Sequence, residues 1–523
     1  MSVNTITVLA RGLALSVAAI ALAGCAVGPD FVRPDAPQTD SYTEEPVPQQ
    51  TVSADTVGGA AQTFAQGKDI QGDWWTLYHS QDINDVVGLA LKGNPDLEAA
   101  QASLREARAN WYVALGPLFP QIDATGGVTR ERLSAAGSGG VAGKNTFTLY
   151  NASVQGSYLL DIWGGSRREL EAAGAREDFA RFELEGTYLT LTSNVVTGAI
   201  QEASLRSQVA ATNDIIKAEA QELNVLQQQF NLGAISEADV LSQQAQLAQT
   251  KATLPGLDKA LAAQRNHLAT LIGRVPSQGN IPAFDLTKLT LPQEIPLSIP
   301  SKLVEQRPDV RAAEGQMHAA LAEVGVATAN LLPQFDLTAN YGGEAFSASK
   351  LFNAPNITWG LGASVLQAIF HGGSLWHARE AAKAEFDRTY AAYKSTVLAA
   401  FEDVANSLRA LQADADTLKA DLEAERAAAG RLHLVQEQFQ AGAVAYLSVL
   451  DAERTEQQAR ITLVQGQAAR FADTAALFHS LGGGWWNNPA PTGDEDKDAS
   501  SKDAADKTAA AADTAGKDDK PKQ

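Results

Sequence analysis

The chain has 523 residues and is acidic, with 41 lysines and arginines against 61 aspartates and glutamates. This length exceeds what one hydrophobic core usually serves, so several domains or an elongated fold are expected. The basic residues are scattered along the chain and form no stripe. The composition therefore argues against nucleic acid as a partner, because phosphates require a basic surface.

The amino terminus has the pattern of a lipoprotein signal. Arg11 precedes an apolar run over residues 13–23, which is too short to cross a bilayer comfortably and indicates a secretory signal. The run ends in Leu-Ala-Gly-Cys, which resembles the bacterial lipobox, and Cys25 is the only cysteine of the chain. We predict that residues 1–24 are removed and that Cys25 becomes a lipidated amino terminus; the alternative is a chance cysteine in a signal peptide. Ala26, in place of the aspartate that commonly retains lipoproteins in the inner membrane, favours the outer membrane.

The rest of the chain is internally duplicated. The Asn-Pro-Asp at residues 94–96 has a counterpart in the Arg-Pro-Asp at residues 307–309, which lies 213 residues later. The same offset, without a gap, pairs PQIDAT at residues 120–125 with PQFDLT at residues 333–338. One register kept over a whole helix and its exit indicates two related halves.

Each half predicts one β-hairpin, because its hydrophobic period changes to two after the shared proline. The four predicted strands lie around residues 122–128, 147–158, 335–341 and 357–365. Strands of about ten residues with one apolar face match transmembrane β-strands. A half-buried sheet in a soluble domain fits the pattern equally well.

A long helix without proline follows each hairpin and turns back at a glycine. The first is predicted to run from residue 166 to about 232, roughly 100 Å in length, and to return over residues 236–272. The second half returns over residues 444–481, and Gly233 and Gly442 mark the two turns. Apolar residues that recur every seven positions predict coiling against neighbouring helices. In the first half they are Phe182, Leu189, Val196, Ala203 and Ala210.

Four strands cannot close a barrel by themselves, because bacterial transmembrane barrels begin at about eight strands and lipid does not tolerate an open edge. If the strands cross a membrane, several chains must share one barrel. The helix pairs would then continue it as a helical tube. A shared barrel joined to such a tube would be a conduit.

No enzymatic activity is predicted. The seven histidines are scattered, and the closest pair, His371 and His377, has no third ligand nearby. No phosphate loop, nucleophile elbow or Cys/His set occurs. No metal or cofactor is expected, apart from the covalent lipid on Cys25.

Several motifs together resemble one known family. The chain looks like the NodT-type outer-membrane lipoproteins, which belong to the TolC-like outer membrane factors, and the likeness extends from Cys25 to about residue 486. The motifs are CAVGPDF at residues 25–31, WWTL at 74–77, GNPDL at 93–97, RPDVRAAE at 307–314 and LGGGW at 481–485.

The resemblance implies an α+β membrane protein of the bacterial outer membrane. It implies a homotrimer with a shared transmembrane β-barrel, four strands per chain, continued by a long coiled α-helical barrel into the periplasm. Such a channel passively conducts small molecules, such as antibiotics and toxic compounds, out of a tripartite efflux system. The implied partners are a periplasmic adaptor, or membrane fusion protein, and an inner-membrane pump, usually of the resistance-nodulation-division type. The cargo is not readable from this chain, since the pump selects it.

The resemblance also implies a periplasmic gate. The family narrows its aperture with a leucine ring and an aspartate ring, and the matching residues are Leu447 and Asp451. The alternative is that Leu447 is ordinary helix packing and Asp451 a solvated residue of a helix start. Asp239 in the first turn is a further gate candidate, or it simply favours the start of its helix. The adaptor is expected to contact the tips around Gly233 and Gly442.

The predicted organisation has six parts. In chain order they are a signal peptide (1–24), a lipidated tether with a segment at the tunnel's equator (25–80), a first repeat (81–280), a linker (281–300), a second repeat (301–490) and a disordered Ala/Lys/Asp tail (491–523), to which no role is assigned. The rival function is that of a periplasmic coiled-coil adaptor or structural lipoprotein. A rival of that kind needs no duplicated strands and forms no pore.

Overall fold

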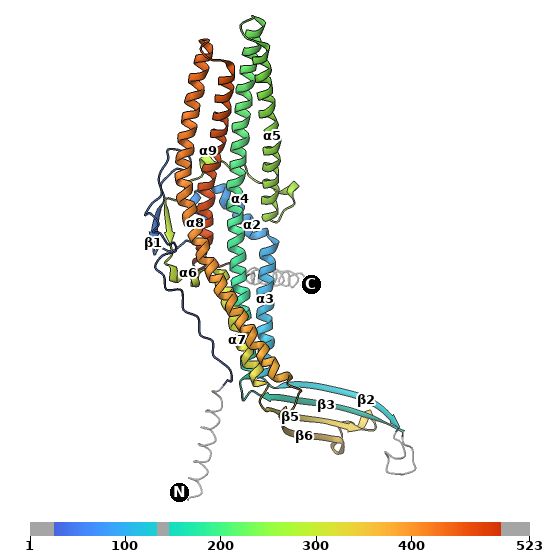
Figure 1. Ribbon diagram of the computed structural model, residues 1–523. Helices are drawn as coiled ribbons and strands as arrows, with labels where there is room; N and C mark the ends of the chain where they lie inside the picture. Colours follow the sequence, from blue (N-terminus) through green and yellow to red (C-terminus); the bar gives the residue numbers. More distant parts are fainter. Residues whose placement is uncertain (1–25, 133–145, 493–523) are drawn as a thin grey trace, which may run out of the picture. The chain divides into compact units, whose positions relative to one another are not determined.

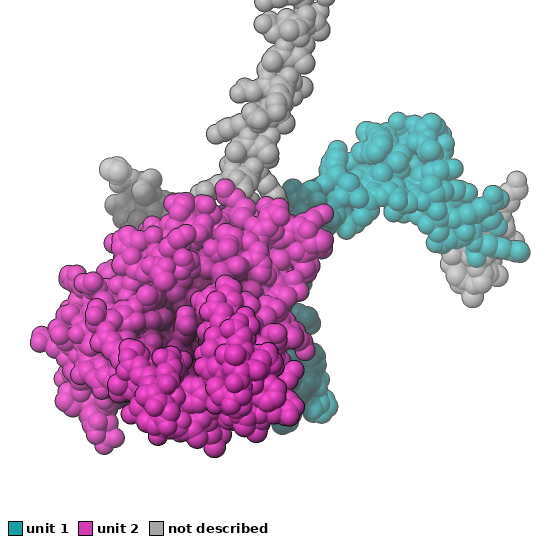
Figure 2. Space-filling view, turned by 90° about the horizontal axis from the view of Figure 1, so that it is seen from above, with its two compact units in different colours: residues 1–34, 104–180, 312–394 teal, residues 35–103, 181–311, 395–523 magenta. Residues whose placement is uncertain are grey.

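A computed structural model of the chain describes residues 26–132 and 146–492. The predictions for residues 1–24, for Cys25 and for the tail from residue 493 onward lie outside the described residues. The chain divides into two compact units (Figure 2). Unit 1 comprises residues 1–34, 104–180 and 312–394, and unit 2 comprises residues 35–103, 181–311 and 395–523. Each unit therefore takes segments from both sequence repeats.

Unit 1 contains a four-stranded antiparallel sheet (Figure 1). Its order is β2 (Gln121–Arg132), β3 (Thr146–Leu160), β5 (Gln334–Ala345) and β6 (Ile357–Leu366). The two predicted hairpins are confirmed, and they join through β3 and β5, which pair from Tyr150 with Ala345 to Leu160 with Phe335. The duplication thus builds one sheet from one hairpin of each half.

Both outer strands of this sheet carry exposed apolar side chains. No residue of β2 or β6 is buried within the chain. Ile122 on β2 is 74% exposed, and Trp359 and Leu361 on β6 are 72% and 80% exposed. A half-buried sheet of a soluble domain would hide one such face in its own core, so the exposure favours the membrane-strand interpretation. Among the described residues, no helix is both long and apolar enough to cross a membrane.

The helices occur in matched sets, one from each half. α3 (Pro95–Leu115) precedes the first hairpin, and α7 (Pro308–Ala329) precedes the second. α4 (Gly165–Asn231) and α8 (Ser374–Gln440) each have 67 residues, while α5 (Glu237–Leu271) and α9 (Tyr446–Ser480) each have 35. These lengths confirm the predicted long hairpins. α5 is one continuous helix through Pro255.

The short elements of unit 2 gather around an aromatic core. Trp74 and Tyr78, in the 3₁₀ helix η1 (Trp74–Tyr78), are fully buried against Phe471 and Phe478 of α9. The Tyr78 hydroxyl donates a hydrogen bond to the Phe471 carbonyl oxygen at 2.8 Å. The other short elements are α2 (Gln81–Gly93), α6 (Pro300–Gln306) and the parallel pair β1 (Thr63–Gln66) and β4 (Glu294–Leu297). The WWTL motif therefore anchors the segment before α2 to α9.

Candidate functional site at the helix tips

The two helical hairpins of unit 2 end in the same kind of turn. At the first tip the Gly233 N–H donates to the Phe230 carbonyl and the Ala234 N–H donates to the Gln229 carbonyl, at 2.8 and 2.9 Å. At the second tip the Gly442 and Ala443 N–H groups make the same two bonds, at 2.9 and 2.8 Å. This is the Schellman pattern, which satisfies the last helix carbonyls. Its left-handed residue is Gly233 with φ 76° and Gly442 with φ 74°, where a side chain would be strained.

The two tips pack against each other within one apolar cluster. Its buried members come from three helices: Leu226 of α4, Val240 of α5, and Tyr446, Val449 and Leu450 of α9. α8 adds partly buried Leu432, Val435 and Phe439. Because side chains from both hairpins share this cluster, its free energy of burial holds the first tip against the second.

A polar network also joins the hairpins. The Oε1 of Glu219 on α4 accepts hydrogen bonds from Thr250 of α5 at 2.8 Å and from Gln457 of α9 at 2.5 Å. It also accepts one from Gln246 of α5 at 3.2 Å, and the Nε of Arg454 on α9 donates to the Oε1 of Gln246 at 2.6 Å. Glu219 is only 2% exposed. This buried carboxyl group therefore links α4 to α5 and to α9 by hydrogen bonds, and α9 belongs to the other repeat.

The predicted gate residues Leu447 and Asp451 lie on the exposed side of the second tip. They are four residues apart on α9 and so share a helix face. Leu447 is 72% exposed, which means that it is not packed within the chain. Asp451 is also exposed and forms an ion pair with Arg431 of α8. An ion pair this exposed contributes little stability, so it leaves Asp451 available for contacts outside the chain.

Asp239 has a structural task at the first tip. It closes a capping box at the start of α5: the Ser236 Oγ accepts from the Asp239 N–H at 3.3 Å, and the Asp239 Oδ2 accepts from the Ser236 N–H at 3.2 Å. The 209-residue offset places Ala445 and Ser448 at the matching positions of the second tip. Ala445 offers no side-chain cap to α9. A capping interaction of about 1 kcal/mol is therefore present at one tip and missing at the other.

Sequence reasoning missed the buried polar side chains behind the tips, namely Glu219, Tyr446 and Glu453. A signal for two of them was present in the repeat. At the offsets that align the halves, Glu219 corresponds to Ala427 and Glu453 to Gln244. A charged residue in one copy opposite an uncharged residue in the other marks a position where the halves have diverged.

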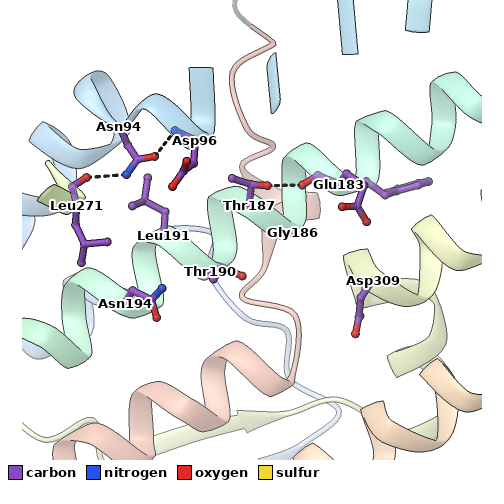
Figure 3. A pocket seen from close by; sticks show the side chains of 11 residues that line it. Asn94, Asp96, Glu183, Gly186, Thr187, Thr190, Leu191, Asn194, Leu271 and Asp309 are labelled. Atoms are coloured by element: carbon purple, nitrogen blue, oxygen red, sulfur yellow. Dashed lines mark hydrogen bonds between the residues drawn. The ribbon is translucent and has the colours of Figure 1, made fainter. Parts of the chain in front are cut away.

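A separate pocket of ≈ 360 Å³ in unit 2 is acidic (Figure 3). Asp96 and Asp309, which match each other in the two repeats, both line it, together with Glu183 of α4. Burial raises the pKa of Glu183, and the charge of Asp309 adds to that rise. Among the described residues that line the pocket, these three carboxyl groups are the only titratable side chains. Among the described residues, no group of three or more His, Cys, Asp or Glu side chains is arranged to hold a metal ion.

The comparisons with known proteins agree with this architecture. The family described as "Outer membrane efflux protein" matches residues 86–274 and 299–483, once in each half. A Pseudomonas putida protein named "Pyoverdine export outer membrane protein OpmQ" is 30% identical over 79% of this chain and 88% of its own length. A Salmonella typhimurium protein named "Probable outer membrane lipoprotein SilC" is 27% identical over 89% of this chain and 96% of its own length. The solved structure of the outer-membrane channel OprN is 26% identical, covers 88% of this chain and all of its own, and superposes with a TM-score of 0.79.

The double match to the family, the full-length relatives and the shared fold leave one assignment. The chain belongs to the outer membrane efflux protein family and is an outer-membrane efflux channel of the TolC-like fold, with no enzymatic activity.

Proposed function

We propose that the channel is a homotrimer that serves as the outer-membrane exit of a tripartite pump. The supporting observation is that, within residues 26–132 and 146–492, β2 and β6 each pair with one strand of the sheet and leave its two edges open. Open edges are not tolerated in lipid. Three chains supply twelve strands for one closed barrel and twelve long helical segments for one tunnel.

The proposed partners are a periplasmic adaptor and an inner-membrane pump of the resistance-nodulation-division type. The relative OpmQ is named for export of pyoverdine. We propose the same export role for this chain, but we do not propose pyoverdine as its cargo. The expected cargo class is small drugs or toxic compounds. The adaptor would contact the tips around Gly233 and Gly442, where an added side chain would meet no other atom within 4 Å. Such open tips are accessible to a partner.

The proposed gate consists of Leu447 and Asp451 of each chain, gathered around the trimer axis. The observation that carries it is that the two tips are packed together while these two side chains stay exposed on one face of α9. A ring of leucine side chains resists wetting by water, and a ring of aspartate side chains binds cations and repels anions. Asp239 was also predicted to contribute, and its carboxylate is engaged in the capping box of α5.

The proposed lipid anchor is Cys25, and the residues that follow it are held firmly in unit 1. The Val27 N–H donates to the Trp163 carbonyl at 2.9 Å, just past β3. The buried Arg168 of α4 donates to the Val27 carbonyl at 3.2 Å and pairs with Asp30 at 2.6 Å. A lipid on Cys25 would therefore enter the membrane beside the sheet. Mass spectrometry of the mature amino-terminal peptide tests the modification, and an unmodified Cys25 would exclude it.

The function is tested on the purified full-length chain. We expect oligomer bands in gels that disappear on heating, and single-channel conductance in planar bilayers. An adaptor or a structural lipoprotein would give no conductance, which would overturn the channel assignment. Adaptor contact is tested by crosslinking from Leu232→Cys and Ala443→Cys, next to the two tip glycines, and the absence of crosslinks at both would exclude it.

A further inference from the structure

Near the tips, four buried side-chain oxygens have no hydrogen-bond partner in the part of the chain that the structure describes. They are the Oη of Tyr446 and the Oε2 of Glu453 on α9, the Oε2 of Glu219 on α4, and the Oε1 of Gln243 on α5. The four residues are between 0% and 7% exposed. A buried oxygen without a partner costs free energy, and the cost is greater for a charged group than for an uncharged one. We call the contact that these four residues form between the two hairpins the seam. The free energy of packing at the seam therefore depends on the charge of its carboxyl groups.

The two buried carboxyl groups differ in their surroundings. Glu219 has three donors on its Oε1, from α5 and α9, and donors of this kind suit the negative charge of a carboxylate. Glu453, which is 7% exposed and lies near the buried Tyr446, has an Oε2 that accepts no hydrogen bond from the described residues. A negative charge on Glu453 is therefore unfavourable in this environment.

The charged groups around Glu453 are mostly of its own sign. The pKa of Glu453 is raised by the negative charges of Glu219 and Glu222 of α4 and of Glu456 of α9. The pKa of Glu456 is raised in turn by Glu425 of α8. From α5, Asp239 acts on the neighbouring Tyr446. The nearby Arg454 directs its Nε to Gln246, and Arg431 of α8 pairs with Asp451. Burial raises the pKa of Glu453 to about 7, and the glutamates of α4 add to the rise.

We propose that Glu453 is a positioning residue of the gate: protonated, it lets α9 pack against α4, and ionised, it drives the second tip away from the first. The neutral carboxyl group carries no charge to be repelled by the glutamates of α4. The ionised form instead sets a third negative charge beside Glu219 and Glu222, across the seam between the hairpins. This inference rests on the proposed gate, because Leu447 and Asp451 move with the start of α9.

The direction of the pH effect follows from the sign of the shift. Because the pKa of Glu453 in the packed tips lies above its ordinary value of 4.5, its contribution to packing is fully present below about pH 4.5 and is lost as the pH rises through about 7. The ratio of packed to separated tips should fall by up to about tenfold per pH unit near neutrality. Conductance should rise over the same interval.

The test compares three forms of the full-length lipidated channel in planar bilayers, between about pH 6 and pH 8. The wild type should show the rise, and Glu453→Gln, which keeps the shape but cannot ionise, should stay at the low-pH conductance throughout. The matched control is Gln244→Glu, which places a carboxylate at the repeat-equivalent, exposed position of α5 and should retain the wild-type profile. A conductance rise that persists in Glu453→Gln would overturn the proposal. A wild-type conductance that does not change with pH would also overturn it if the distance between the tips, measured as described next, does not change either.

A second readout separates this inference from the gate assignment. Spin labels on Leu232→Cys and Ala443→Cys, diluted with unlabelled chains, report the distance between the tips. The distance should lengthen with pH in the wild-type background and stay constant with Glu453→Gln. If the distance between the tips changes with pH while the conductance does not, Glu453 controls the packing of the tips, and Leu447 and Asp451 do not form the gate. A distance that does not change between the two pH values contradicts the role of Glu453.

Discussion

The first and second helix tips share a turn and differ in how the next helix begins. Both end a 67-residue helix with the same two hydrogen bonds around a left-handed glycine. The first tip then starts α5 with a complete capping box and presents the small residues Ala238 and Ser242. The second starts α9 without a side-chain cap and presents Leu447 and Asp451 at the matching positions. Duplication thus supplied the frame, and divergence gave the two tips different helix caps and different exposed side chains.

The largest predicted difference between the tips concerns Tyr446. It is 2% exposed in the shared cluster, and its repeat counterpart Glu237 is exposed. Tyr446→Ala should cost about 3–5 kcal/mol of local stability because it empties a buried aromatic site. Glu237→Ala should stay within about 0.5 kcal/mol. Hydrogen exchange of the tip amides measures both, and equal effects would show that the two tips are energetically alike.

Tyr446→Phe refines this comparison. The tyrosine hydroxyl is buried without a partner, so removing it while keeping the ring should be neutral or slightly stabilising. A loss as large as that of Tyr446→Ala would mean that the hydroxyl, and not the ring, stabilises the tip.

A smaller difference is expected at the helix starts. Ser236→Ala should weaken the start of α5 by about 1 kcal/mol, because it removes the capping box. The double change Ala445→Ser with Ser448→Asp transplants that box to α9 and should slow amide exchange there by a similar free energy. If the transplant lowers conductance as well, the missing cap is part of what lets the second tip move. An unchanged exchange rate at α9 would show that its start is already fixed by packing.

Much of this fold could be predicted because it follows from period and repetition. The helical pattern located the first long helix and both returning helices to within about two residues, which is the usual uncertainty of helix ends. The period of two located the four strands to within about four residues. The pairing of β3 with β5 could not be read in the same way, since strand order depends on contacts between halves that lie far apart in sequence. The motif resemblance selected Leu447 and Asp451, which the structure leaves exposed.

The buried polar seam was beyond sequence reasoning for a physical reason. Glu219 lies about four helical turns before the tip. Its hydrogen-bond partners Gln246 and Gln457 belong to two other helices. Glutamates and glutamines are also ordinary residues of an exposed helix face, so their type alone does not reveal burial. Only the packing of four helices shows that Glu453 lacks a donor.

The central claim is that the second tip, and not the first, closes the channel. Single-channel conductance of the purified trimer tests it most directly, with Leu447→Ala and Asp451→Ala compared with Leu241→Ala and Ser242→Ala on the exposed side of the first tip. We expect a higher conductance for both second-tip variants and wild-type conductance for both first-tip variants. Unchanged conductance in Leu447→Ala and Asp451→Ala, or an equal rise from the first tip, would contradict it.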